Sequence, residues 1–300
     1  MQNNIAPPFG TEATNRALEE ASRLDLCERK KWINSNLSEL PDYLHKYMSL
    51  NVEDPKSCEK LHSIIVDSYL WLCSPRHFND PFDMTSHIEL EKDAQTLRKF
   101  VKKGIKDFNP ELGYKDREDL VDRYMSNQED FKNHVRDTFR SKIEGVGVCC
   151  LSEDPVNILM WSHYAEKHSG FAMRFSVVQD VQVFARSLPV EYSQEYPVIV
   201  WPSDSGQMDK KIILGKHDGW KYEKEFRVIH PTGANSLLRF KPEALTGIYI
   251  GCRTPEKSVM KLKSFLDKRN ALGYPTPELF QVNKHSKKYG LEVVPYKLTS

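Results

Sequence analysis

The stretch that decides the fold is residues 147–175, GVCCLSEDPVNILMWSHYAEKHSGFAMRF. It opens and closes with apolar runs that have the length of a buried strand. Between these runs, Asp154 is a good N-cap and Pro155 suits the first helical position. We therefore predict a helix from Pro155 to about His168, with Gly170 as its stop. A strand, a helix and a second strand form the centre of the predicted fold.

The sequence on either side of this stretch carries further helix and strand patterns. Apolar residues at helical spacing predict a helix over about 14–37, two amphipathic helices between His87 and Ile143, and a helix over about 254–271. Short apolar runs bounded by turn residues predict strands at 69–73, 190–192, 226–230, 237–240, 247–250, 279–282 and 291–296. Helices in the middle and strands toward the end favour an α+β fold over a βαβ repeat.

The predicted core is a mixed or antiparallel sheet with inserted helices. Residues 1–40 are expected to form an N-terminal helical extension. Residues 41–300 are expected to form a single α+β domain, with a helical insertion at about 88–143.

The charge balance excludes a global attraction to nucleic acid or anionic lipid. Lys and Arg total 43 against 42 Asp and Glu, so the formal net charge is +1 and any such binding has to be local. The six cysteines show no Cys-x-x-Cys spacing and are expected to be reduced thiols. The first residues lack the basic and apolar regions of a signal peptide, and no stretch is long enough to cross a bilayer. We expect a cytoplasmic protein with no membrane partner.

Several familiar catalytic motifs are absent from the sequence. Neither GxxxxGK[ST] nor GxGxxG occurs, which argues against Walker-type and Rossmann phosphate loops. No Gly-x-Ser-x-Gly elbow and no His-Glu-x-x-His helix is present, which weakens hydrolase and zinc-protease interpretations.

Polar and aromatic side chains around the predicted helix form the first candidate site. Ser152 and Glu153 lie at the end of the first strand, where sites often form. The helix presents Trp161 and Tyr164 toward one side. Rings at helical spacing are more often core residues than ligand contacts, so a structural role is the alternative.

A second candidate is the segment WKYEKEFRVI, residues 220–229. As this segment enters a strand, Glu223 and Glu225 are expected to project to one face and Lys224 to the other. Two carboxylates on one face of a pocket can hold a cationic ligand or transition state. The alternative is a solvated edge strand with alternating charge.

Two shorter segments also carry candidate residues. The loop Asn79-Asp80-Pro81-Phe82-Asp83 offers an amide and two carboxylates, although an Asx turn explains it adequately. The segment His45-Lys46-Tyr47 places a cation between rings that can clamp a phosphate or stack a base, although a surface lysine is the commoner outcome. A metal nuclease is possible through the carboxylates of Asp80, Asp83, Glu153, Glu223 and Glu225. Nothing in their spacing selects a metal.

Six blocks of sequence, in this order, resemble the family called domain of unknown function 2971. They are LHKYMSL, LWLCSPRHFNDPFD, the stretch of residues 147–175, PVEYS, WKYEKEFRVI and LLRFKPEALTGIYIG. The resemblance runs from about Leu44 to about Gly251. This family brings no activity with it.

The chain also resembles, more weakly, the ADP-ribosyltransferases. Their cores carry His or Arg on a first strand, Ser or Tyr on a middle strand and helix, and Glu on a late strand. In this sequence those places fall on His45 or Lys46, on Ser152 and Tyr164, and on Glu225. Glu223-Lys224-Glu225 is similar to the paired Glu-x-Glu of the arginine-modifying and toxin branch. The first strand departs from the pattern, because His-Gly or Arg-Gly is expected where His45-Lys46-Tyr47 stands.

This second resemblance implies an ADP-ribosyltransferase-like fold and an enzyme that uses NAD as its substrate. Glu225 would stabilise an oxocarbenium-like charge and Glu223 would orient the acceptor nucleophile, while Tyr164 or Trp161 would stack on nicotinamide. The residues expected to hold NAD are His45, Lys46, Tyr47, Ser152, Trp161, Asn79 and Asp80. Removing Glu225 is expected to cost about 10²-fold or more in rate.

Three hypotheses from different classes follow. The first is an ADP-ribosyltransferase-type enzyme that cleaves NAD and modifies a protein or nucleic acid, as a toxin or a phage-defence effector with a neutralising or sensor partner. The second is a metal-dependent nuclease or phosphodiesterase built on Asp80, Asp83 and Glu225. The third is a non-enzymatic module that binds a nucleotide or peptide. Nicotinamide release, metal-dependent cleavage of nucleic acid, and binding without turnover distinguish them.

Overall fold

The computed structural model describes residues 12–204 and 208–297. It divides into two compact units. Among the described residues, unit 1 comprises residues 12–77, 146–190 and 219–297, and unit 2 comprises residues 78–145, 191–204 and 208–218. Residues 1–11 of the predicted N-terminal extension lie outside the described residues.

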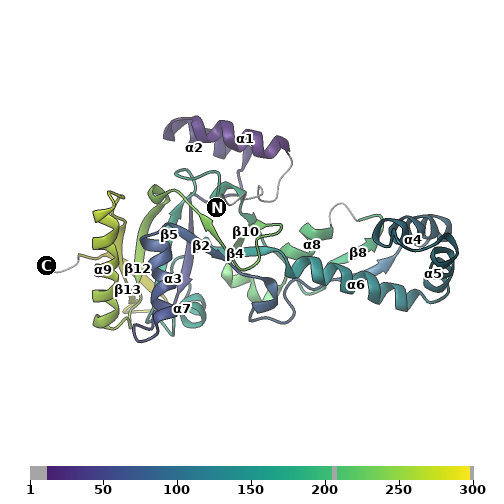
Figure 1. The fold of residues 1–300 in the computed structure, drawn as a ribbon. Coiled ribbons are helices and arrows are strands. Elements are labelled where there is room, and N and C mark those ends of the chain that lie inside the picture. Colours follow the sequence, from purple (N-terminus) through teal and green to yellow (C-terminus); the bar gives the residue numbers. More distant parts are fainter. Residues whose placement is uncertain (1–11, 205–207, 298–300) are drawn as a thin grey trace. The chain divides into compact units, whose positions relative to one another are not determined.

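Unit 1 is built on an eight-stranded sheet in the order β14-β13-β12-β5-β1-β4-β10-β6 (Figure 1). Its strands are β1 (Tyr43–Met48), β4 (Gly147–Ser152), β5 (Phe171–Ser176), β6 (Leu188–Pro189), β10 (Glu225–His230), β12 (Leu245–Ile250), β13 (Glu278–Lys284) and β14 (Leu291–Pro295). Neighbouring strands are antiparallel except β12 and β13, which are parallel. This mixed sheet confirms the predicted α+β class.

Helices cover both faces of the sheet, and the central strands are therefore buried on both sides. α3 (Pro55–Ile65) and α9 (Glu256–Ala271) pack on the face that carries Ile248, whereas α7 (Ile158–Tyr164) packs on the face that carries Tyr249. Successive residues of a strand point to opposite faces, which is why β12 contributes to both cores. A separate antiparallel pair in unit 1 joins β2 (Tyr69–Leu72) to β11 (Ser236–Arg239).

The N-terminal extension contains two helices, α1 (Glu12–Arg23) and α2 (Leu26–Asn36), so the prediction of one helix over about 14–37 is wrong. Asp25 interrupts the helix because its carboxylate accepts a hydrogen bond from the Glu28 amide at 2.9 Å and begins α2 as an N-cap. The Arg29 guanidinium donates to the carbonyl oxygens of Ala21, Ser22, Leu24 and Val178. Three of these bonds tie α2 to the end of α1, and the bond to Val178 ties α2 to the rest of unit 1.

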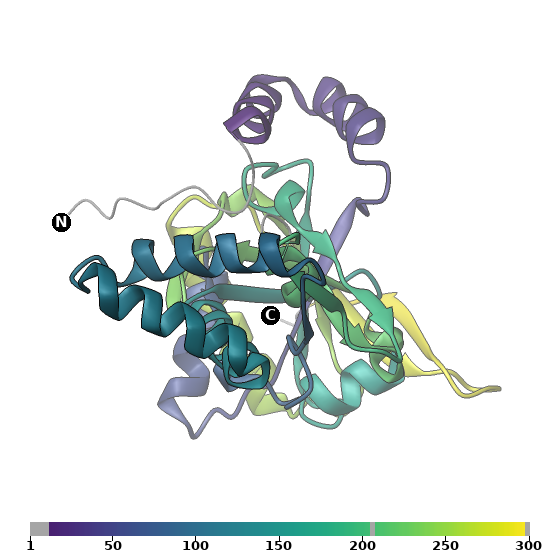
Figure 2. The ribbon, with the colours of Figure 1, turned by 90° about the vertical axis from the view of Figure 1, so that its right-hand side faces the viewer.

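Unit 2 contains the predicted helical insertion. β3 (His87–Leu90) pairs in parallel with β8 (Val198–Trp201), and β7 (Glu191–Ser193) pairs in parallel with β9 (Gly215–His217). The helices are α4 (Ala94–Phe108), α5 (Tyr114–Ser126), α6 (Gln128–Glu144) and α8 (Met208–Leu214). α4 packs on α5 and α5 on α6, as Figure 2 shows.

The prediction of two helices between His87 and Ile143 is therefore wrong. The segment opens with a strand and continues as three helices. Asn127 separates α5 from α6, because its side-chain oxygen accepts a hydrogen bond from the Asp130 amide at 3.1 Å and caps a new helix. The apolar residues keep a regular helical spacing across Asn127, so the pattern does not indicate the break between α5 and α6.

The central helix α7 is shorter than the predicted span of Pro155 to His168. Asn157 is its N-cap, because the side-chain oxygen accepts hydrogen bonds from the Leu159 and Met160 amides at 2.9 and 3.2 Å. The chain leaves the helix through three successive residues with φ of 45°, 54° and 72°, at positions 166–168. Gly170 then lies so close to β1 that a Cβ atom there would stand 2.2 Å from the Met48 carbonyl oxygen.

Candidate functional site

The polar candidates of unit 1 gather where β4 ends and β10 begins. His45 of β1 pairs with Ser152 of β4, and Ser152 pairs on its other side with Glu225 of β10. Paired residues on neighbouring strands present their side chains to the same face. The register therefore brings these three predicted residues into one row across the sheet.

Glu223 lies outside that row. It is the last residue of a 3₁₀ helix, η3 (Asp218–Glu223), and Lys224 follows with φ of 43° before β10 begins. The prediction that Glu223 and Glu225 project from one face of a strand is therefore wrong, because the left-handed residue between them redirects the chain. The Tyr164 hydroxyl donates to the Glu223 carboxylate, with 2.6 Å between Oη and Oε1. The structure thus joins two of the predicted catalytic residues.

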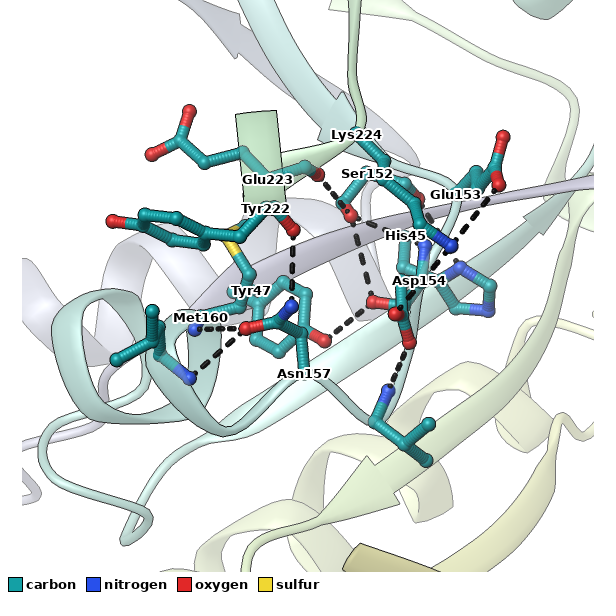
Figure 3. A network of polar contacts seen from close by, with 12 residues as sticks. His45, Tyr47, Ser152, Glu153, Asp154, Asn157, Met160, Tyr222, Glu223 and Lys224 are labelled. Atoms are coloured by element: carbon teal, nitrogen blue, oxygen red, sulfur yellow. Dashed lines mark hydrogen bonds and ion pairs between the residues drawn. The ribbon is translucent and has the colours of Figure 1, made fainter. Parts of the chain in front are cut away.

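A hydrogen-bond network holds the segment after β4 against the segment before β10 (Figure 3). The Ser152 hydroxyl donates to the Glu223 carbonyl oxygen at 2.6 Å and accepts from the Asp154 amide at 3.1 Å. The Asn157 side-chain nitrogen donates to the Tyr222 carbonyl oxygen at 3.0 Å. These bonds fix the backbone on both sides of Glu223, so its carboxylate meets Tyr164 in a defined position.

Glu225 forms a buried ion pair with Arg227. The guanidinium reaches both carboxylate oxygens, with Nε at 2.8 Å from Oε1 and Nη2 at 3.2 Å from Oε2. The side chains are 4% and 0% exposed. Cys150 lies opposite Arg227 in the sheet, and burial, followed by the charge of Glu225, raises the pKa of its thiol well above the usual value. Cys150 is therefore protonated at neutral pH and is not an activated nucleophile.

His45 is a buried, neutral imidazole. Its Nδ1 lies 3.2 Å from the Ser152 carbonyl oxygen, which can only accept, so Nδ1 carries the proton and Nε2 has a free lone pair. Burial is the main cause that lowers the pKa of His45 to about 4, and the Arg174 charge adds to it. Nε2 has no hydrogen-bond partner among the described residues. The Tyr249 ring packs edge to face against the His45 ring, with 5.5 Å between the two centroids.

Lys46, Tyr47 and Trp161 have structural partners. The Lys46 ammonium donates to the Cys150 carbonyl oxygen at 3.0 Å; burial lowers the pKa of Lys46, but the neighbouring thiols and Glu225 outweigh it and raise that pKa. Tyr47 and Trp161 are packed edge to face in the core, and Trp161 is fully buried. Trp161 therefore does not present a face for stacking on a ligand in this conformation.

The predicted loop residues Asn79 and Asp80 belong to unit 2, whereas Glu225 belongs to unit 1. The Asp80 carboxylate accepts from the Phe82 amide at 2.9 Å, the geometry of an Asx turn. The Asp83 carboxylate lies 3.6 Å from the Lys216 ammonium. Within residues 12–204 and 208–297, no group of three or more His, Cys, Asp or Glu side chains is arranged to hold a metal ion.

Reasoning from sequence missed Arg227, Asn157 and Tyr222 as parts of this site. Arg227 follows Glu225 at the two-residue period of a strand, so a buried pair on one face could have been inferred from that spacing. Asn157 offered a helix N-cap signal that competed with Asp154. The bond from Asn157 to Tyr222 joins distant segments, and no local pattern signals it.

A family model described as protein of unknown function (DUF2971) matches residues 160–228. Residues 160–228 are therefore similar to the DUF2971 family. The matched range contains Tyr164, Glu223, Glu225 and Arg227, so the DUF2971 match spans both the hydrogen-bonded pair and the ion pair. No curated protein and no solved structure gave a significant match to the chain. Among the described residues, the helices are too short or too polar for any of them to span a bilayer.

Proposed function

We propose that this chain cleaves NAD at the nicotinamide–ribose bond and transfers ADP-ribose to a macromolecular acceptor, with Glu223 as the functional carboxylate. The observation that supports this most directly is the 2.6 Å hydrogen bond from the Tyr164 hydroxyl to Glu223. This bond fixes the position of one oxygen of the Glu223 carboxylate. The bond also ties the acid to an aromatic ring of the kind that packs against nicotinamide.

Cleavage of the nicotinamide–ribose bond requires a negative charge at a position shielded from water. Breaking the bond between nicotinamide and ribose develops positive charge on the ribose, and a fixed carboxylate nearby stabilises that charge. Glu223 is 3% exposed, so its charge acts in surroundings of low dielectric, where it is worth more than in water. The Ser152 hydroxyl holds the Glu223 backbone in place at 2.6 Å, which supplies preorganisation.

Glu223 is preferred over Glu225 for this role because it accepts the Tyr164 hydrogen bond, whereas Glu225 is engaged by Arg227. The guanidinium engages both oxygens of Glu225 and offsets its charge, so Glu225 has less attraction for a developing cation. In this proposal Glu225 fixes the start of β10 and Glu223 meets the substrate. This assignment reverses the roles that the resemblance to ADP-ribosyltransferases implied.

The acceptor in this proposal is a protein or a nucleic acid. Modification of a host target would make the chain a toxin or an antiviral defence effector, with a neutralising or sensor partner. A cytoplasmic location belongs to the same proposal and is supported by the six cysteines, all within the described residues and none in a disulfide.

The test is to incubate the purified protein with NAD and to measure released nicotinamide. Glu223→Gln is expected to lower the rate by about 10²-fold or more, because it removes the charge and preserves the shape. Glu53→Gln makes the same change at an exposed carboxylate of unit 1 and serves as the matched control. Wild-type protein that binds NAD without turnover would contradict the proposal and support the non-enzymatic alternative.

A further inference from the structure

A pocket of about 410 Å³ lies in unit 1 beside the first strand of the sheet. It is lined by residues 38–43, by His45 and by Glu153. None of these residues contacts Tyr164 or forms the Glu225 ion pair in the bonds described above, so the pocket is distinct from the Glu223 position. It is joined to that position through Ser152, whose carbonyl oxygen accepts from His45 and whose hydroxyl donates to the Glu223 carbonyl.

His45 lines this pocket and carries a buried acceptor, Nε2, that has no hydrogen-bond partner among the described residues. The side chain is 4% exposed, and the bond from Nδ1 to Ser152 fixes both the tautomer and the ring orientation. The two nitrogens of an imidazole point away from each other, so Nε2 faces away from Ser152 with its lone pair. No described residue donates to it. A buried acceptor without a donor is costly, and a ligand that brings an N–H group would satisfy it.

The charge at the rim favours a cation. Glu39, Asp42 and Glu153 line the pocket, and the two carboxylates with partners pair with lysines at the surface. Lys30 lies 2.9 Å from Asp42 and Lys224 lies 3.5 Å from Glu153, and both lysine side chains are about half exposed. Ion pairs of this exposed kind contribute little and exchange readily. A ligand cation can therefore take the place of either lysine.

Arg174, on the neighbouring strand β5, is a cation whose charge acts on His45. Its guanidinium lies 4.8 Å from the centroid of the Tyr43 ring and 2.6 Å from the Glu278 carboxylate. The charge of Arg174 is thus offset by Glu278, and it leaves the carboxylates of the pocket to a ligand.

We infer that this pocket binds an organic cation, a guanidinium or a primary ammonium, that donates one N–H to His45 Nε2 and others to the carboxylates at the rim. Both groups carry several N–H donors and no acceptor, which matches a neutral imidazole acceptor surrounded by carboxylates. Binding of such a cation does not depend on cleavage of NAD.

The test uses n-butylguanidinium as the probe and n-butylurea as its neutral counterpart of the same shape. Binding to the full chain is measured by calorimetry, and the ¹⁵N resonance of His45 Nε2 is followed in the same titration. n-Butylguanidinium is expected to bind saturably and to shift that resonance. Glu153→Gln and His45→Phe are each expected to weaken binding by about tenfold or more, whereas Glu53→Gln is expected to leave it unchanged.

Two further arms decide the source and the validity of the site. The first arm measures binding of a short peptide with one arginine, acetyl-Gly-Arg-Gly-amide. If the peptide binds more tightly than n-butylguanidinium, the natural ligand is a side chain of a protein partner. If it binds more weakly, the natural ligand is a free small molecule. Equal binding of n-butylurea would overturn the inference. So would binding of n-butylguanidinium that Glu153→Gln leaves unchanged, since Glu153 is exposed and its replacement is not expected to disturb folding.

Discussion

Glu223 and Glu225 are separated by one residue, but the protein gives them different partners and different surroundings. Glu223 ends a 3₁₀ helix and accepts a hydrogen bond from Tyr164, whereas Glu225 begins β10 and accepts from Nε and Nη2 of Arg227. Lys224, with φ of 43°, turns the chain between them. The comparison teaches that one carboxylate is paired with a fixed cation on its own strand, whereas the other accepts a hydrogen bond from an aromatic residue of the central helix α7.

The largest effect is expected when the ion pair is broken from one side. Glu225→Gln removes the negative charge that pairs with the buried Arg227 guanidinium, and the free energy of unfolding is expected to fall by about 3–5 kcal/mol. Urea unfolding followed by circular dichroism measures this. Replacing the pair together, Glu225→Met with Arg227→Leu, is the control and is expected to recover most of the loss. A Glu225→Gln protein as stable as the wild type would show that the pair does not hold the start of β10.

Acidification is expected to destabilise the fold through His45. Its folded-state pKa of about 4 lies below the ordinary value of 6.5, so the unfolded chain binds the extra proton first as the pH falls. Stability is therefore present above about pH 6.5 and is lost as the pH falls toward 4, by up to about 3 kcal/mol. The difference in unfolding free energy between wild type and His45→Phe, measured across this range, reports the effect.

The matched control for this titration is His87→Phe, which removes an imidazole that is 59% exposed. It is expected to retain the dependence of the wild type on pH. If His45→Phe and the wild type lose stability in parallel between pH 6.5 and 4, the buried neutral state of His45 is incorrect.

A smaller effect is expected from the hydroxyl that distinguishes Glu223. Tyr164→Phe removes a hydrogen bond to a charged group and keeps the ring, so nicotinamide release is expected to fall by about tenfold. Tyr222→Phe is the comparison, because it removes a hydroxyl from the neighbouring aromatic segment. Equal rates of nicotinamide release for Tyr164→Phe and the wild type would show that this hydrogen bond does not contribute to activity.

The smallest effect concerns the turn that separates the two glutamates. Lys224→Gly is expected to raise the unfolding free energy by up to about 1 kcal/mol, because glycine adopts a positive φ without the cost that a Cβ atom imposes. Lys224→Ala removes the same exposed ion pairs and keeps the Cβ atom, so it is the control and should show no gain. A gain in both variants would trace the effect to the lost lysine charge instead of the turn.

The buried strands of the sheet and the helix at about 254–271 could be predicted closely, but the ends of α7 could not. The strand expected at 226–230 is β10, Glu225–His230, and the one expected at 247–250 is β12, Leu245–Ile250. Continuous apolar runs in a buried sheet leave few alternatives. The ends of α7 depend on which of two capping residues bonds to the helix, and on a close approach to β1, which local sequence does not reveal.

The sequence predicted some residues of the candidate site but not how they pair. Tyr164 and Glu223 were both predicted as site residues, but the strand pattern placed Glu223 on the same face as Glu225. In the structure, the left-handed backbone of Lys224 separates the two glutamates. A positive φ at a lysine carries no signature in the sequence. The neutral state of His45 likewise depends on burial by distant elements, among them β5 and β12.

The most direct test of the account compares nicotinamide release from NAD by Glu223→Gln and by the paired variant Glu225→Met with Arg227→Leu, at equal folded concentration. Glu223→Gln is predicted to lose about 10²-fold or more in rate, and the paired variant is predicted to stay within about tenfold of the wild type. The opposite order, with the paired variant inactive and Glu223→Gln active, would contradict the assignment of Glu223 as the functional carboxylate.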